Sequence, residues 1–406
     1  MLAATLFAFA ALAPASLEES LPKAPDARAV LDALKRANVL LVDAQEAFAP
    51  KPAKPKNGDT IAPTKKSALP REWPYEGVYR VGGDIPIGYR IGGTAIVATA
   101  LIEAAGGEPE GAARQSIEGG LDFVLEALDD PRMSPEFVKG YDVRGWGHAY
   151  ALGFLLRLRA ANLVPKKRVA DVEAAVDMLV ARLQVTEIGA RGGWNYSRPA
   201  GDDSDASTFM TASTLLFLFE ARQQGETVDE AVVERALKTL EDARIATSAF
   251  QYGSKKSAQT GRGGEEVPGS IGRMAVCEIA LHLAERGSVE RIRGSIEAFF
   301  EHWQHLEDRR AQNGTHVPPY QVAPYYFFYA HRHVAQAIEF LPEAERPALR
   351  EKLYALLWQV REKSGGWNDR VFPRSESFGT AMTVMALREP SMPRPAGWRA
   401  QARSGR

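Results

Sequence analysis

A turn followed by an apolar helix recurs along this 406-residue chain, and this repeat limits what the chain can fold into. Gly192-Gly193-Trp194-Asn195 precedes a Ser/Thr-rich stretch at 208–214, and Gly365-Gly366-Trp367-Asn368 precedes a similar stretch at 377–383. A shorter echo, Gly92-Gly93-Thr94-Ala95, resembles Gly379-Thr380-Ala381. A unit of this length cannot bury its apolar face alone, so its copies must stack on one another.

Two kinds of predicted helix alternate between the turns. Segments such as 168–183 and 344–360 carry apolar residues at spacings of three and four, which is typical of helices with one face in water. Other segments are apolar nearly all round, which indicates buried helices. These buried segments are 94–105, 149–156, 211–219, 274–283 and 380–387.

The spacing of these segments predicts a ring. Amphipathic segments begin near Pro25, Gly111, Arg168, Thr227, Ser288 and Ala344, and apolar segments begin near Gly92, Gly145, Ser207, Gly272, Ala323 and Ser377. We therefore predict an all-α fold, an (α/α)6 toroid of six outer–inner helical hairpins, in which closure leaves no open end to cap. An open array of hairpins is the alternative.

The chain outside the repeats suggests how the protein is organised. The apolar start followed by Ala13-Pro14-Ala15 predicts a signal peptide over 1–15 and therefore export to the periplasm or the extracellular space. A single toroid is expected over 25–390, with an exposed Pro/Lys-rich connector at 51–66 and a flexible tail at 391–406. No later segment predicts a membrane span, so none is expected after leader removal.

Composition removes several classes of function. The net charge is −1, with 50 basic and 51 acidic residues, so nucleic acid is a poor candidate partner. The one cysteine, Cys277, lies on an apolar segment and is expected to be buried and inert. The sequence has no P-loop and no nucleophile elbow, and it predicts no cofactor.

The recurring Gly-Gly-Trp has a structural and a functional interpretation. Glycines allow a sharp turn between an outer and an inner helix. Trp194 and Trp367 could then pack between hairpins, with the indole N–H donating to a carbonyl left open at a helix end. The functional alternative is an aromatic wall for an apolar or cationic ligand.

Gly-x-Trp followed by a Ser/Thr-rich inner helix, in about six hairpins, resembles the prenyltransferase and squalene-oxidase repeats. These repeats belong to the terpenoid cyclase and protein prenyltransferase superfamily, whose fold is an α/α toroid. The resemblance covers roughly residues 71–390 and implies the fold more specifically than an activity.

The catalytic motifs of that superfamily are not intact in this chain. Asp202-Asp203-Ser204-Asp205 differs in order from the Asp-x-Asp-Asp of squalene cyclases, and no Gln stands four residues before Gly192 or Gly365. Cys277 lacks the Asp of the prenyltransferase zinc motif, and Cys277-Glu278-Ile279 is not a thioester sequence. The resemblance therefore leaves the activity unassigned.

The mouth of the axial cavity, where loops lead into the inner helices, is the expected site. Its predicted ligand-binding residues are Tyr89, Arg90, Trp146, His148, Trp194, Arg273, Tyr325 and Trp367. Asp202, Asp203 and Asp205 are the candidate catalytic residues, because neighbouring carboxylates can raise one pKa and so supply a general acid. Helix capping by Asp205, Ser207 and neighbouring side chains is the structural alternative.

We predict no metal site. His331 and His333 are two residues apart and do not share a helix face, while His302 and His305 do share one but lack a third ligand. His148 stands alone in a Trp/Gly turn, where a histidine usually has a structural role.

Three functions follow from these residues. The first is binding of a ligand or partner, namely a small molecule, a glycan or a peptide, at the cavity mouth. The second is a polysaccharide lyase or glycosidase that uses the acidic cluster. The third is an isoprenoid cyclase-like enzyme that uses an aromatic cavity.

Overall fold

The computed structural model describes residues 23–48, 71–76, 83–138, 143–196, 205–253, 263–310, 312, 314–369 and 372–399. The predicted signal peptide at 1–15 and the connector at 51–66 lie outside these residues. Twelve α-helices occupy the described part of the chain, and its one small sheet pairs β1 (Glu46–Ala47) with β2 (Arg71–Glu72) in antiparallel register. This composition confirms the predicted all-α class.

The helices alternate between an outer and an inner layer, as the sequence predicted. The outer helices are α1 (Ala27–Asp43), α3 (Gly111–Ala127), α5 (Val169–Val185), α7 (Glu230–Ala243), α9 (Val289–Arg310) and α11 (Arg346–Gln359). The inner helices are α2 (Ile87–Ala104), α4 (Arg144–Ala160), α6 (Thr208–Gln223), α8 (Val267–Leu283), α10 (Tyr326–Ile338) and α12 (Ser375–Arg388). Short 3-10 turns are η3 (Pro131–Met133), η4 (Lys166–Arg168) and η5 (Glu389–Ser391).

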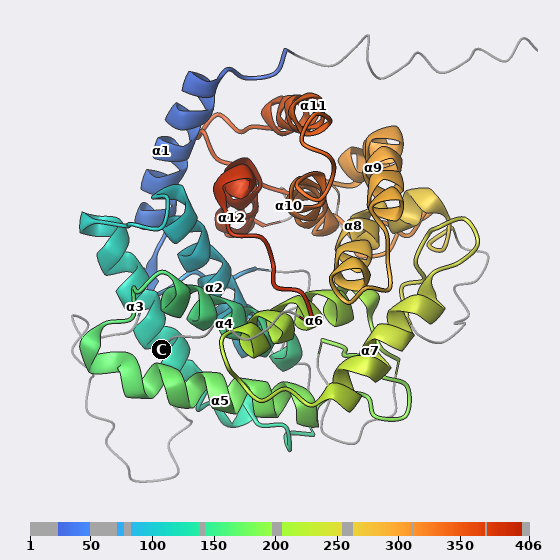
Figure 1. Ribbon diagram of the computed structural model, residues 1–406. Coiled ribbons are helices and arrows are strands. Elements are labelled where there is room, and N and C mark those ends of the chain that lie inside the picture. Colours follow the sequence, from blue (N-terminus) through green and yellow to red (C-terminus); the bar gives the residue numbers. More distant parts are fainter. Residues whose placement is uncertain are drawn as a thin grey trace, which may run out of the picture.

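The inner helices close into a ring. Each inner helix contacts the next one along the chain, and α12 returns to contact α2. Figure 1 looks roughly along the ring axis and shows the outer helices around the inner ones. The closed (α/α)6 toroid is therefore confirmed, and the open array is not.

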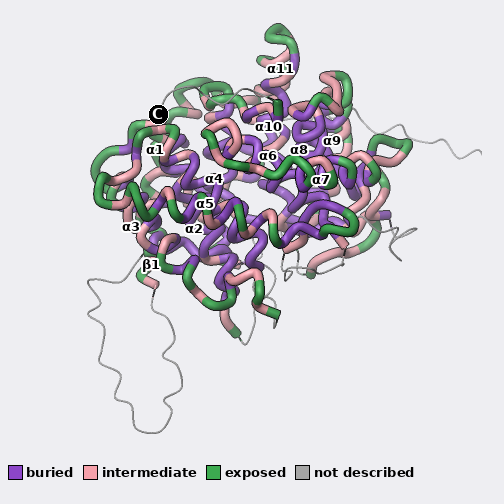
Figure 2. The backbone as a smooth tube through the Cα atoms, turned by 60° about the horizontal axis from the view of Figure 1, so that its bottom comes forward, coloured by how far each residue is buried: buried purple, intermediate pink, exposed green. Residues whose placement is uncertain are grey.

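Burial explains why each helix takes its layer. Most side chains of α2, α6 and α8 are buried, whereas α7 buries only one stripe that includes Val233, Leu237 and Leu240. A helix that is apolar on every side is most stable when neighbours cover its whole surface, because burial removes apolar area from water. Figure 2 shows the same separation, with buried segments inside and exposed segments at the rim.

The recurring tryptophan joins each of its loops to two helices. The indole N–H of Trp194 donates to the Leu183 carbonyl at 2.6 Å, and that of Trp367 donates to the Leu357 carbonyl at 2.8 Å. Both carbonyls lie in the last turn of an outer helix, where the helix supplies no further backbone N–H donor. Both tryptophans are buried, which supports the structural interpretation of the motif.

The same loops are also bound to the following inner helix. The backbone N–H of Trp194 donates to Thr211 Oγ1 at 3.1 Å, and that of Trp367 donates to Thr380 Oγ1 at 3.0 Å. This bond explains why threonine recurs in the inner helices.

A third copy of this arrangement was missed in the sequence. The Trp73 indole donates to the Leu41 carbonyl at 2.6 Å, and its backbone N–H donates to Thr94 Oγ1 at 3.0 Å. No Gly-Gly precedes Trp73, so the motif search did not find it. The echo of Gly93-Thr94 in Gly379-Thr380 now has a cause, because a Cβ on either glycine would lie 2.5 Å from the carbonyl oxygen of Trp73 or Trp367.

The observed first residue of each helix lies within five residues of the start predicted from the sequence. The two largest differences are at helices whose predicted start was a glycine. The α2 and α8 helices begin at Ile87 and Val267, before the predicted starts at Gly92 and Gly272. These glycines sit inside helices because their missing side chains admit a neighbour. A Cβ on Gly92 would lie 2.4 Å from the Trp146 ring.

The predicted flexible tail needs correction over 391–399. Trp398 is buried, its backbone N–H donates to the Leu283 carbonyl at 2.9 Å, and its ring packs on Phe219 with centroids 5.5 Å apart. The Arg222 guanidinium lies 4.1 Å from the Trp398 ring centroid. We call residues 392–398 the C-terminal strap, and Figure 1 shows it running from α12 across the ring towards α6.

Candidate functional site

An aromatic cavity lies where the inner helices begin. Its volume is about 80 Å³, and all six hairpins contribute side chains to it. We call it the aromatic cavity, and its lining is Tyr75, Tyr89, Trp146, Tyr150, Tyr196, Phe209, Met210, Ser213, Tyr252, Tyr325, Tyr326, Tyr329 and Phe378. Eight of the 12 tyrosines in the chain are among these residues.

The aromatic side chains come from equivalent places in the repeats. Tyr75, Tyr196 and Tyr252 lie in loops that lead into inner helices. Trp146 and Tyr150 are four residues apart on α4, so both point to the same side of that helix. The toroid therefore gathers local features from distant parts of the chain at one end of its axis.

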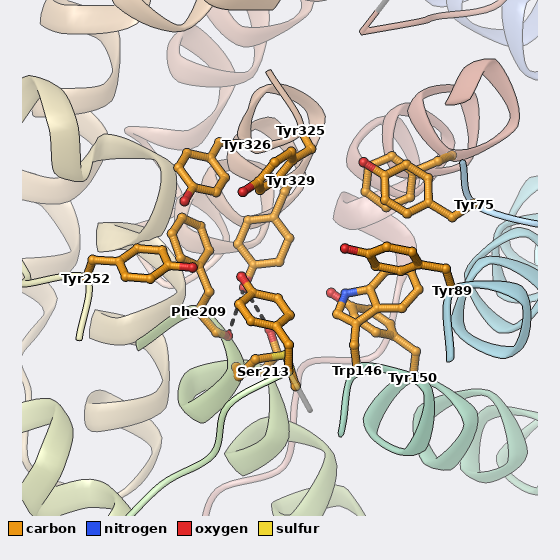
Figure 3. A pocket seen from close by; sticks show the side chains of 13 residues that line it. Tyr75, Tyr89, Trp146, Tyr150, Phe209, Ser213, Tyr252, Tyr325, Tyr326 and Tyr329 are labelled. Carbon is orange, nitrogen blue, oxygen red and sulfur yellow. Dashed lines mark hydrogen bonds between the residues drawn. The ribbon is translucent and has the colours of Figure 1, made fainter. Parts of the chain in front are cut away.

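The rings form two groups on facing sides of the cavity (Figure 3). In the first group, Tyr75 lies 5.4 Å from Tyr89 and 4.4 Å from Phe378 between ring centroids. In the second, Phe209 stacks on Tyr326 at 4.3 Å. Such contacts hold the rings in fixed orientations, so the cavity is largely preformed.

The tyrosine hydroxyls add hydrogen-bonding groups to this apolar lining. The Tyr329 hydroxyl is 2.7 Å from Ser213 Oγ, and the buried Tyr326 hydroxyl has no partner among the described residues. Burial raises the pKa of Tyr75, Tyr326 and Tyr329 well above its usual value, so these hydroxyls stay neutral donors at physiological pH.

Three predicted ligand-binding residues line the aromatic cavity, namely Tyr89, Trp146 and Tyr325. Trp194 and Trp367 do not line it, because their indoles are held against the ends of α5 and α11. The structure therefore places these two tryptophans in the packing between hairpins rather than at the site.

The two predicted arginines lie behind the lining. Buried Arg273 donates to the carbonyls of Phe250 and Gly269 and stacks behind Phe209, with its guanidinium carbon 5.7 Å from that ring. Arg90 forms an ion pair with Glu72, and burial of this glutamate raises its pKa to about 7. Both guanidinium groups therefore support the fold around the cavity instead of entering it.

His148 does not line the aromatic cavity either. It is fully buried on the first turns of α4, and desolvation by burial lowers its pKa to about 3. It is therefore neutral at physiological pH, which agrees with the structural role expected for it.

The predicted acidic cluster is only partly described. Asp202 and Asp203 lie outside the described residues. Asp205 lies in the loop before α6, and its carboxylate sits so close to Gly253 that a Cβ there would lie 2.0 Å from Oδ2. Ser207 is the N-cap residue of α6, but its side chain makes no capping hydrogen bond. The lining of the aromatic cavity, as described, contains no carboxylate and no guanidinium.

One carboxylate approaches the first ring group from outside. Buried Asp369 accepts a hydrogen bond from Ser375 Oγ at 2.6 Å, and its charge adds to the burial that raises the pKa of Tyr75. Asp369 directly follows the Gly-Gly-Trp-Asn of the last repeat in the sequence.

Most of the lining was not predicted. Tyr75, Tyr150, Phe209, Tyr252 and Phe378 were assigned no role in the sequence analysis, although all five line the cavity. The sequence did contain a pattern that could have indicated this lining, because a tyrosine stands in the loop or first turn ahead of most inner helices.

The histidines do not form a metal centre in the described parts of the chain, where no group of three His, Cys, Asp or Glu side chains is placed to hold an ion. His331 accepts from the Trp303 indole at Nε2 over 2.9 Å, and its Nδ1 lies 2.7 Å from the Phe327 carbonyl. Burial lowers the pKa of His331 and of His333 to about 3.

Among the described residues, no helix has the length and apolar character needed to cross a membrane.

Solved structures with this fold include enzymes. An inactive variant of the α-1,6-mannanase GH76A from Salegentibacter sp. HEL1_6, in complex with α-1,6-mannotriose, covers 89% of this chain and 100% of its own, with a TM-score of 0.52 and 11% identity. The Lin0763 protein from Listeria innocua covers 88% of this chain and 96% of its own, with a TM-score of 0.51 and 13% identity. The type II terpene cyclase MstE from Scytonema is less similar, with a TM-score of 0.49, 15% identity, and coverage of 89% of this chain and 98% of its own.

The likenesses to the mannanase and to the Lin0763 protein show the fold of this chain, an α/α toroid. No family model matches the chain. No curated protein matches it either.

Proposed function

We propose that this protein binds a small neutral polyhydroxylated ligand, such as the end of an oligosaccharide, in the aromatic cavity. One observation carries the proposal: aromatic faces from all six hairpins and tyrosine hydroxyls from five of them converge on one small space. A sugar ring offers apolar C–H faces to stack on aromatic rings and hydroxyl groups to pair with phenols.

The electrostatics of this end of the ring favour a neutral ligand over a cation. All six inner helices begin there, and the positive ends of their dipoles oppose a bound cation. The guanidinium of Arg273 behind Phe209 and Tyr252 acts in the same direction. The buried Tyr326 hydroxyl has no partner among the described residues, and a quaternary ammonium group cannot supply one.

The size of the cavity argues against an isoprenoid substrate. Sites for drug-sized ligands have roughly 300–1,000 Å³. The aromatic cavity has about 80 Å³, which is too small for a folded polyprenyl chain and admits only the edge of a terminal sugar ring, with the rest of the ligand outside. We keep export as part of the proposal, since an extracellular or periplasmic protein would meet glycans.

The experiment is calorimetric titration with α-1,6-mannotriose, mannose and a panel of neutral oligosaccharides. Tyr326→Phe removes the hydroxyl that has no described protein partner, and it should weaken saccharide binding by about 3- to 10-fold. Tyr354→Phe is the matched control, because its hydroxyl donates to the Leu387 carbonyl away from the cavity, and we expect less than a twofold change.

Two results would overturn this proposal. One is binding of tetramethylammonium while every saccharide fails to bind. The other is saccharide binding that is equally strong in both variants, since the ligand would then sit elsewhere.

A second candidate is glycoside hydrolysis by Asp202 and Asp203. The mannanase of the same fold is inactivated by replacing two consecutive aspartates, and this chain has such a pair before α6. Incubation with α-1,6-mannotriose and chromatography of the products tests this candidate. Cleavage that disappears in Asp202→Asn and Asp203→Asn would favour it over binding alone.

A further inference from the structure

A second cavity lies at the opposite end of the axis, where the inner helices end. Its volume is about 210 Å³, and its lining comes from the later turns of α2, α4, α6, α10 and α12 and from the C-terminal strap. Tyr150 and Ser213 line both cavities, so they stand between the two. We call this second space the strap cavity.

The body of the strap cavity is apolar and adaptable. Three of the eight methionines in the chain line it, namely Met382, Met385 and Met392. Phe154 and Phe217 line it as well. Methionine is unbranched and polarisable and adjusts to flexible apolar ligands, so this lining suits an alkyl chain better than a rigid ring system.

Three arginines, Arg157, Arg332 and Arg394, also line the cavity, and each has donors that no described residue uses. Arg157 donates to Glu103 through Nε and Nη2, and Arg332 donates to Glu389 through Nη1. Nη1 of Arg157 and the other two nitrogens of Arg332 have no partner in the described chain.

Arg394, on the strap, is the most available of the three. It is exposed, it has no described carboxylate within 4.0 Å, and its guanidinium carbon lies 5.9 Å from the Phe340 ring. It therefore keeps its whole fork of donors for a carboxylate that approaches from the cavity.

Negative groups at this end of the ring oppose the binding of an anion in the strap cavity. Glu103 is neutralised by Arg157, whereas Glu220 accepts only from Gln224 Nε2, at 2.7 Å. The inner helices also direct the negative ends of their dipoles this way, although that field fades beyond the last turn. Glu103 pairs with Arg157 and Glu389 pairs with Arg332, so these two guanidinium groups carry no net charge to the cavity. The charges that remain are Glu220 on α6 and Arg394 on the strap, so an anion is favoured at the strap and not deeper in the cavity.

We propose that the strap cavity binds a small amphiphilic carboxylate. Its alkyl chain lies among the methionine and phenylalanine side chains, and its carboxylate lies at the rim, where Arg394 and the unused donors of Arg332 receive it. An apolar cavity of roughly 150 Å³ holds benzene, so this one has room for about eight non-hydrogen atoms. Octanoate fits that size with its carboxylate at the rim.

The test is calorimetric titration of the full chain with octanoate, 1-octanol and octylamine, which share one chain length and differ in head-group charge. We expect octanoate to bind at least about 10-fold more tightly than octanol, because a charge-assisted hydrogen bond is lost with the alcohol. Octylamine should bind most weakly. Octylamine binding as tightly as octanoate, or no binding of any of the three, overturns the proposal.

Two variants locate the ligand. Arg394→Gln should weaken octanoate binding about 5- to 10-fold and octanol binding less than twofold, whereas Arg399→Gln, beyond Trp398 and paired with Glu285, should change neither. Ala160→Trp, an exposed position in the cavity lining, should block both ligands without disturbing the core. Octanoate affinity unchanged in both Arg394→Gln and Ala160→Trp would refute the assignment.

This inference is independent of saccharide binding. Tyr326→Phe changes the aromatic cavity alone and should leave octanoate affinity unchanged. Failure of one proposal therefore leaves the other standing.

Discussion

Single residues in this toroid act by joining elements that are far apart in sequence. Each of Trp73, Trp194 and Trp367 satisfies a carbonyl at the end of an outer helix and offers its backbone N–H to a threonine of an inner helix. An unpaired buried carbonyl costs about 1–3 kcal/mol, so these indoles contribute through their N–H as well as through their area.

Trp367→Phe should therefore lower the free energy of unfolding by about 1–3 kcal/mol, because the Leu357 carbonyl loses its donor and a small cavity forms. Denaturant unfolding followed by circular dichroism measures this change. Trp358→Phe is the control, since its half-buried indole has no hydrogen bond to a described residue, and it should cost less than about 1 kcal/mol. Equal losses in the two variants would show that the N–H group contributes nothing.

The same residues show how far a local pattern can be interpreted. The Gly-Gly-Trp motif predicted the packing role of Trp194. It also predicted that the indole N–H donates to a carbonyl at a helix end, where carbonyls are always left open. Trp73 makes the same bonds without the motif. No Gly-Gly precedes it in the sequence, so only the folded structure reveals it as a third copy.

Elements outside the repeats also carry stability. The C-terminal strap crosses the end of the ring and is anchored by Trp398 between Phe219 and Arg222. The sequence predicted a flexible tail over 391–406, but a large buried aromatic ring outweighs the entropy of ordering a few residues.

Trp398→Ala should destabilise the protein by about 3–5 kcal/mol, because it removes a buried ring together with its contact to Phe219. Thermal unfolding and denaturant titration report the change. Arg399→Ala, an exposed neighbour in the same segment, should alter stability by less than about 0.5 kcal/mol. An unchanged stability in Trp398→Ala would restore the flexible-tail interpretation for 391–399.

At the scale of the whole molecule, burial makes folding stability depend on pH. His148, His331 and His333 have their pKa lowered to about 3 by burial, from a usual value of 6.5. Between these two values the unfolded chain binds more protons at these histidines than the folded chain does, so they destabilise the fold as pH falls below 6.5. Glu72 acts in the opposite direction, because burial raises its pKa to about 7 and the folded state keeps that proton.

Comparing the native protein with a variant of one histidine isolates the contribution of that histidine to the pH dependence of stability. On moving from pH 7 to pH 5, His148 in the native protein should contribute a loss of about 2 kcal/mol, given about 1.4 kcal/mol per pKa unit. His148→Leu should lack this loss, so its stability should fall less over the same interval. Denaturant unfolding at both pH values measures the slopes, and parallel slopes would mean that His148 is not held neutral in the fold.

The sequence alone determined the ring. Hydrophobic periodicity and helix spacing are local properties, and their recurrence over six units was enough to predict twelve helices in two layers and the closure between them. Tyr89, Trp146 and Tyr325 were found by the same means, because the expected mouth lies at a fixed point in each repeat.

Only the tertiary structure decided which side chains meet at each end of the axis. Tyr75 and Phe378 are in contact although about 300 residues separate them, and the strap enters the lining of a cavity whose other walls come from five different helices. Such meetings depend on how far each helix is rotated and how long each loop is. No local period contains that information, because packing free energy is shared by the whole ring.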